Sequence, residues 1–157
     1  MTPHVQQLLD ELRATLEPTR QLSLVAQVTR QVYELLVLEL DLLRVSSAIA
    51  PELTELAQQI EEKRRQNQAS LITYLHEQEC LRQDISPEEA TDELWALTSY
   101  DLYRMLVGER HWSPDRYEAW LTRLLVQNLL QPVDGHISSL HGGFPMTTSN
   151  EAETAIQ

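Results

Sequence analysis

The stretch Asp92–Leu125, DELWALTSYDLYRMLVGERHWSPDRYEAWLTRLL, decides the fold of this chain. It contains all three tryptophans and three of the five tyrosines of the protein. Its apolar residues recur at helical spacing on both sides of Ser113-Pro114-Asp115. A serine can cap a helix, and a proline fits the first turn because that turn needs no N–H. The stretch therefore predicts two amphipathic helices joined by a turn.

Prolines mark further helix starts along the chain. Gly108 is the only glycine before residue 135, and few β-branched residues alternate, which favours helix throughout. Apolar runs with helical spacing follow Pro3, Pro18, Pro51, Pro87 and Pro114. Ser86-Pro87-Glu88-Glu89 matches a capping box. We expect an all-α fold with helices near residues 3–16, 18–47, 51–81, 87–107 and 114–130.

The second of these helices has an unusual pattern. From Val32 to Val45 it reads VYELLVLELDLLRV, which is apolar nearly all round. A helix that is apolar on every side is normally central and buried, so we expect this one at the centre of the core. Glu34, Glu39 and Asp41 then need partners or a route to solvent.

Composition and charge exclude several classes of protein. The chain has 157 residues, room for one domain with a core, which we place at 1–130, followed by a flexible polar tail at 131–157. The net charge of −12 opposes the phosphate backbone of nucleic acids. No apolar run is long enough to cross a membrane, and the N-terminus does not resemble a signal peptide. We expect a cytoplasmic protein.

Polar residues interrupt an apolar stripe on the third helix. Arg64 and Asn67 follow Ile60 on that stripe and precede Leu71. A pocket between helices would explain the interruption; a helix that bends away and exposes these side chains to water would explain it equally well. On the next helix, Thr98 could face a pocket or bond back to its own helix. The candidate ligand-binding residues are Tyr33, Leu36, Arg64, Asn67, Leu71, Tyr74, Thr98 and Asp101.

The last two helices carry an aromatic stripe that suits either an interface or ordinary core packing. We favour an interface, because tryptophan and tyrosine are common anchors of protein contacts. The candidate interface residues are Trp95, Leu102, Tyr103, Tyr117, Trp120, Leu121, Leu124, Leu125 and Asn128.

Metal and catalytic chemistry have little support in the sequence. His76 and Cys80 lie four residues apart on one helix face, but a zinc site needs three or four ligands. No nucleophile, base and acid set and no glycine-rich phosphate loop are present. We expect no enzyme activity, no metal and no cofactor.

Two segments resemble a known family. SPEEATDELWALTS (86–99) and LYRMLVGERHWSPDRYEAWL (102–121) are similar to the last helices of the C-terminal domain of tetracycline-repressor-family (TetR-like) transcription regulators. The likeness extends over Gln21–Leu130. It implies a five-helix bundle with an effector pocket among the long helices. It also implies a homodimer in which the last two helices of each chain form a four-helix interface.

The chain departs from that family at three places. Tyr100-Asp101 stands where many relatives have Pro-Glu, so a helix kink is not expected there. His111 stands where many have glycine, so Gly108 is expected to end the helix. Too few residues precede Pro18 for the helix-turn-helix domain that begins such regulators. The chain is then either a fragment or a naturally headless relative, and it would reach DNA only through the missing domain.

Two functions remain open. The first is the effector-binding and dimerisation domain of a TetR-like regulator, which binds a small apolar or aromatic molecule and no DNA by itself. The second is a headless helical interaction module that pairs with a full-length regulator and binds no ligand.

Overall fold

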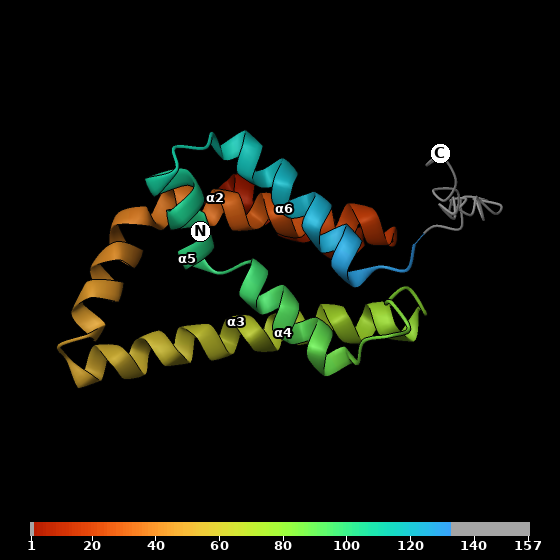
Figure 1. Ribbon diagram of the computed structural model, residues 1–157, viewed down its shortest axis with the longest axis horizontal. Helices are drawn as coiled ribbons and strands as arrows, with labels where there is room; N and C mark the ends of the chain where they lie inside the picture. Colours follow the sequence, from red (N-terminus) through yellow and green to blue (C-terminus); the bar gives the residue numbers. More distant parts are fainter. Residues whose placement is uncertain (1, 133–157) are drawn as a thin grey trace, which may run out of the picture.

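The computed structural model describes residues 2–132, and within them the fold is all-α, as the sequence predicts (Figure 1). The helices are α1 (Pro3–Ala14), α2 (Pro18–Ser47), α3 (Pro51–Glu77), α4 (Pro87–Leu97), the short α5 (Tyr100–Tyr103), the π-helical segment η1 (Arg104–Glu109) and α6 (Pro114–Leu129). The described residues hold no strand, only an isolated antiparallel bridge between Leu81 and Leu130. The expected tail falls almost entirely at 133–157, outside the described residues.

Local capping explains where the helices begin. Each of the five prolines named above is the first residue of a helix, as expected. Ser86 and Glu89 form the predicted capping box, with Glu89 N donating to Ser86 Oγ at 3.1 Å and Ser86 N donating to Glu89 Oε2 at 2.9 Å. Ser113 caps α6 in the same way, through Arg116 N at 3.2 Å. These contacts satisfy N–H groups that have no partner inside the helix.

The third helix ends earlier than expected. α3 ends at Glu77 rather than at residue 81, because Glu79 adopts a left-handed conformation with φ 56°. The N–H of Cys80 then donates to Leu75 O at 2.9 Å, which closes the helix end. The chain turns there and runs back toward α4.

The predicted helix 87–107 is interrupted, so the expectation of no kink near Tyr100 was wrong. α4 ends at Leu97, and Ser99 caps the new helix α5 through Leu102 N. Gly108 does not end the helix either, because it lies inside η1. The chain leaves the helix at His111, whose φ is 55°, and Trp112 N donates to Leu106 O at 2.9 Å.

The core lies where three helices meet the first half of α2. α6 packs along this half of α2, and α4 packs on α3 (Figure 1). The core residues are Leu22, Ala26, Tyr33, Ile72, Leu75, Leu81, Ala90, Leu94, Tyr103, Tyr117, Leu121, Leu125, Leu129 and Leu130. α2 kinks at Leu36, whose φ of −113° and ψ of 15° are not helical.

Beyond this kink the second half of α2 leaves the core, so the prediction that Val32–Val45 is central and buried was wrong. Tyr33 is the only buried residue of that stretch, whereas Leu38 is 78% exposed and Leu42 is 68% exposed. Figure 1 shows this half of α2 and the start of α3 extending past the ends of α4 and α6. The second half of α2 still has Leu40 and Leu43 partly buried toward α3 and α5, whereas its face with Leu38, Leu42 and Val45 is open to solvent.

Candidate ligand-binding site

A groove of about 640 Å³ lies between α1, the start of α2 and the second half of α3. Its apolar lining comes from four leucines, Leu9, Leu12, Leu16 and Leu71. Its polar lining residues are Arg13, Thr15, Gln21, Asn67, Ser70 and Tyr74. An apolar surface with a few polar groups is the usual make-up of a site for a small organic molecule. The volume lies within the range of about 300–1,000 Å³ typical of such sites.

Contacts between α1 and α2 fix one wall of the groove. The Arg20 guanidinium bonds the Glu11 carboxylate through Nη2 at 2.5 Å and Nε at 3.0 Å. Gln21 Nε2 donates to Thr15 O at 2.8 Å, in the loop that joins the two helices. Val5 and Leu8 are buried on the inner face of α1. These bonds hold α1 against α2 and leave Leu9, Leu12 and Leu16 to line the groove.

Among the polar residues of this groove, Gln21 lacks a hydrogen bond to its side-chain oxygen in the described part of the chain. Its side chain is almost fully buried, and its Oε1 atom has no hydrogen-bond partner within residues 2–132. An acceptor left unpaired in this way costs about 1–3 kcal/mol. A donor on a bound molecule would recover that free energy. Arg13, which pairs with Asp10 at 3.0 Å, places a positive charge at the same groove.

Three predicted ligand-binding residues, Tyr33, Arg64 and Thr98, meet instead in a polar cluster between α2, α3 and the end of α4. Arg64 Nη1 donates to Thr98 Oγ1 at 2.8 Å and to Trp95 O at 2.9 Å. Gln68 Nε2 donates to the same hydroxyl at 2.7 Å. The Thr98 hydroxyl donates back to Leu94 O at 2.6 Å, as the helix-bonded alternative predicts.

The cluster holds the break between α4 and α5 in place. Tyr33 Oη donates to Thr98 O at 2.6 Å, which satisfies a carbonyl at the open end of α4. Burial raises the pKa of Tyr33 to about 12, against a partial lowering by the nearby Arg64 charge. The Arg64 guanidinium also lies over the Trp95 ring, 5.3 Å from its centre. The side chains of Tyr33, Arg64 and Thr98 all bond within this cluster, so we assign it a structural role. Two buried atoms beside it, Gln68 Oε1 and Trp95 Nε1, have no hydrogen-bond partner within residues 2–132.

The predicted ligand residues therefore do not form one pocket. Asn67, Leu71 and Tyr74 line the groove together. Leu36 lies at the kink of α2, in a separate hollow with Val5 and Val32. Asp101 is exposed on α5 and lies 3.8 Å from Arg104. The fourth helix breaks at Thr98, and Asp101 then lines a separate hollow with Ile60 and Glu61 of the first half of α3.

Several predicted interface residues belong to the core of the single chain. Tyr103, Tyr117, Leu121 and Leu125 are buried among the helices, which corrects their assignment to a dimer contact. Trp95 packs against Arg64. Partly exposed positions remain at Leu102, Trp120, Leu124 and Asn128. The Trp120 ring meets the Trp112 ring edge to face, with centres 6.0 Å apart.

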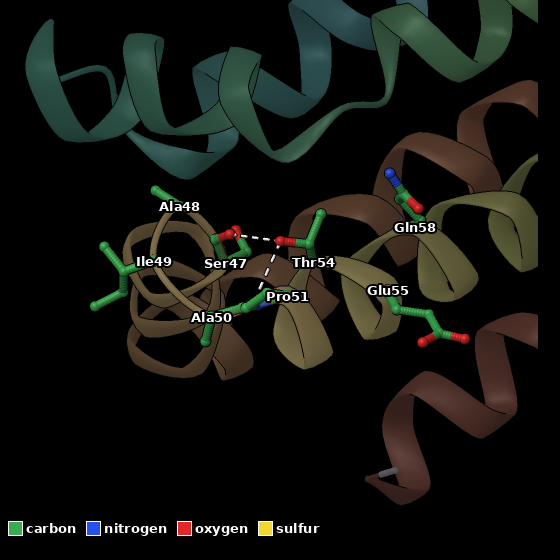
Figure 2. A pocket seen from close by; sticks show the side chains of 8 residues that line it. All are labelled: Ser47, Ala48, Ile49, Ala50, Pro51, Thr54, Glu55 and Gln58. Carbon is green, nitrogen blue, oxygen red and sulfur yellow. Dashed lines mark hydrogen bonds between the residues drawn. The ribbon is translucent and has the colours of Figure 1, made fainter.

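Another hollow, of about 360 Å³, lies beside the turn between α2 and α3 (Figure 2). Thr54 Oγ1 donates to Ser47 O at 2.5 Å and to Ala50 O at 3.3 Å, as the dashed lines in Figure 2 show. Ile49 and Glu55 point away from the turn. Since the threonine hydroxyl already serves the turn, this hollow is a weaker candidate than the groove.

Sequence reasoning missed most of the groove. It did not consider α1, which supplies Leu9, Leu12, Arg13 and Leu16. A signal was present: Val5, Leu8, Leu12 and Leu16 repeat at helical spacing, next to Leu9. The stripe shows that α1 has an apolar face, but not that part of it lines a groove with α3.

Two further classes of site are absent from the part of the chain that the structure describes. No group of three or more histidine, cysteine, aspartate or glutamate side chains there could hold a metal ion. Among residues 2–132, no helix is both long enough and apolar enough to cross a bilayer.

Comparison with protein-family models, with curated proteins and with solved structures found no match to this chain.

Proposed function

We propose that this chain is the effector-binding and dimerisation domain of a TetR-like transcription regulator. In this proposal the groove between α1 and α3 takes a small apolar or aromatic molecule. The observation that carries the proposal is the groove itself, with Asn67, Leu71 and Tyr74 from the predicted ligand set on one wall. The resemblance of Ser86–Leu125 to the family supplies the class of protein.

The residues that line the groove indicate which kind of ligand would bind there. Four leucines favour an apolar or aromatic body. Arg13 favours an anionic or strongly polar group on that body, and Gln21 Oε1 favours a hydrogen-bond donor. The ligand would therefore be amphipathic, with its polar groups near the joint between α1 and α2.

The proposal assigns no DNA binding to the chain alone. The net charge of −12 repels phosphate. Contact with DNA would require another domain, and the ligand would act by changing how two copies are held together. The surface for that pairing would be the outer side of α5 and α6, at Leu102, Trp120, Leu124 and Asn128.

A thermal-shift screen of small aromatic and aliphatic compounds tests ligand binding, because a ligand raises the melting temperature by mass action. Asn67→Trp should abolish the shift, since a large ring at this exposed position would fill the groove. Gln66→Trp is the matched control, as Gln66 is exposed on the same helix and does not line the groove. Hits that respond equally in both variants would contradict the site.

Light scattering tests the dimer. A dimeric mass that Trp120→Glu reduces to the monomer would support pairing through α6. A monomer at all concentrations would contradict the dimerisation half of the proposal while leaving the ligand half to the screen.

A further inference from the structure

The exposed half of α2 displays an apolar seam with coiled-coil spacing. Its residues are Leu35, Leu38, Leu42, Val45 and Ile49, separated by three, four, three and four positions. Such alternation keeps side chains on one line along a straight helix and is the repeat that faces a partner helix. Leu38, Leu42 and Val45 share such a line, whereas Leu35 lies before the kink at Leu36. Four of the five lie within α2, and Ile49 follows in the turn after Ser47.

The seam is open to solvent along its full length. Leu38 is 78% exposed, Leu42 68%, Val45 58% and Ile49 84%. Together the five side chains expose an area on the order of 600 Å², the upper end of the largest apolar patch on a typical monomer. One partner of a standard interface contributes about 800 Å². The seam alone therefore offers about three quarters of the area that one partner contributes to a standard interface.

Acidic residues flank the seam. With Leu35 and Leu42 at the first position of the heptad, Glu34, Glu39 and Asp41 occupy the flanking positions that choose the partner in a coiled coil. Glu34 bonds Arg30 of its own helix at 3.2 Å, and Asp41 lies 3.9 Å from Arg44. Glu39 has no ion-pair partner within residues 2–132. The flanks carry no basic residue.

Charge decides between a second copy and a different partner. In a parallel pair of two such seams, Glu34 of one copy would face Glu39 of the other. Like charges across a coiled coil disfavour the pair, and each chain also carries a net charge of −12. A partner helix with lysine or arginine at its flanking positions would instead attract the acidic residues beside the seam.

We propose that the second half of α2 is a docking site for a basic amphipathic helix of a partner protein. The partner would place its apolar stripe on Leu38, Leu42 and Val45, with Leu35 and Ile49 at the two ends, and its cations beside Glu34 and Glu39; the Oδ1 atom of Asp41 is buried and less accessible. This surface is separate from the groove, so the proposal stands apart from ligand binding.

Two synthetic peptides of 21 residues test the docking site. Both have leucine at the seam positions, one has lysine at the flanking positions, and the other has glutamate there. Fluorescence anisotropy of the labelled peptides on the full chain should show the lysine peptide binding at least about tenfold more tightly. Glu39→Lys should reduce that preference by about two- to fivefold, the size expected of one exposed ion pair.

A double variant separates docking from general attraction to an acidic protein. Leu38→Gln with Leu42→Gln keeps the charge and should weaken the lysine peptide at least about tenfold. Both side chains are largely exposed, so the helical circular dichroism should not change. Leu56→Gln is the matched control, because Leu56 is 45% exposed, lies on α3 and belongs neither to the seam nor to the groove.

Three results would overturn the proposal. The first is equal affinity for the lysine and glutamate peptides. The second is unchanged binding of the lysine peptide to the double variant, which would reveal charge attraction alone. The third is a dimer of the chain by light scattering that the double variant, but not Leu56→Gln, converts to monomer; the occupant would then be a second copy.

Discussion

Two buried tyrosines of the same core should respond differently to loss of the hydroxyl group. Tyr33 and Tyr117 both pack on Tyr103, with ring centres 5.5 Å and 5.0 Å away. Tyr33 Oη donates to Thr98 O at 2.6 Å. Tyr117 Oη is buried and has no hydrogen-bond partner within the described residues. Substitution by phenylalanine keeps the ring and removes only the hydroxyl, so it isolates the polar contribution.

The magnitudes follow from these contacts. Tyr33→Phe removes a short bond and leaves Thr98 O with only the long contact of 3.4 Å from Arg64. The free energy of unfolding should fall by about 1–2 kcal/mol. Tyr117→Phe removes a hydroxyl that is buried at a cost, so unfolding free energy should stay equal or rise by up to about 1 kcal/mol.

Urea denaturation followed by circular dichroism at 222 nm measures both changes. For a domain of this size, 1 kcal/mol corresponds to roughly 2–4 °C in melting temperature, which thermal melts can resolve. The slope of the urea transition should be unchanged in both variants. Equal losses in the two variants would refute the reasoning, because the ring packing would then matter and the hydroxyl partner would not.

Three further outcomes are expected. Ser86→Ala should lower the unfolding free energy by about 1 kcal/mol in urea denaturation, because the capping box of α4 is lost; no change would mean that the cap is not needed. The contribution of Tyr33 to the free energy of unfolding should be fully present below pH 10 and should be lost as the pH rises toward 12, because burial raises the pKa of Tyr33 to about 12 and the folded chain favours the neutral phenol. Melting temperatures measured from pH 9 to 12 test this, and Tyr33→Phe should reduce the loss. Leu38→Gln with Leu42→Gln should leave the melting temperature within about 2 °C of the parent, because both side chains already face solvent; a larger fall would show that the single chain buries them.

Sequence reasoning succeeded where the cause is local. A serine or proline at a helix start acts through contacts within four residues, as Ser86 and Glu89 do. The starts of α2, α3, α4 and α6 could be read for this reason. The ends of α3 and of the predicted helix 87–107 were less predictable, since Glu79 and His111 take left-handed conformations without being glycine.

The break after Leu97 has a cause that lies far away in the sequence. Thr98 is held by Arg64 and Gln68, which come from α3, and by Tyr33 from α2. The separations are 34, 30 and 65 residues. Ser99 caps α5 locally, but no pattern near Thr98 indicates the bonds to α2 and α3, so the sequence predicts one continuous helix.

The second half of α2 shows the limit of hydrophobic periodicity. The apolar pattern predicts that the side chains of Leu35–Val45 are buried, but it does not say whether the same chain or a partner buries them. The other helices of the described chain bury Leu22, Ala26 and Tyr33 in the first half of α2 and leave Leu38, Leu42 and Val45 exposed. A heptad reading of Leu35, Leu38, Leu42 and Val45 would have pointed to a partner rather than to the core.

Hydrogen–deuterium exchange on the complex with a compound from the screen tests the proposed ligand site most directly. The account predicts added protection in peptides covering 9–16 and 67–74, the two walls of the groove. Peptides covering 35–49 should exchange as in the free protein. Protection confined to 35–49, or no protection in either wall of the groove, would contradict the proposal that this groove is the effector site.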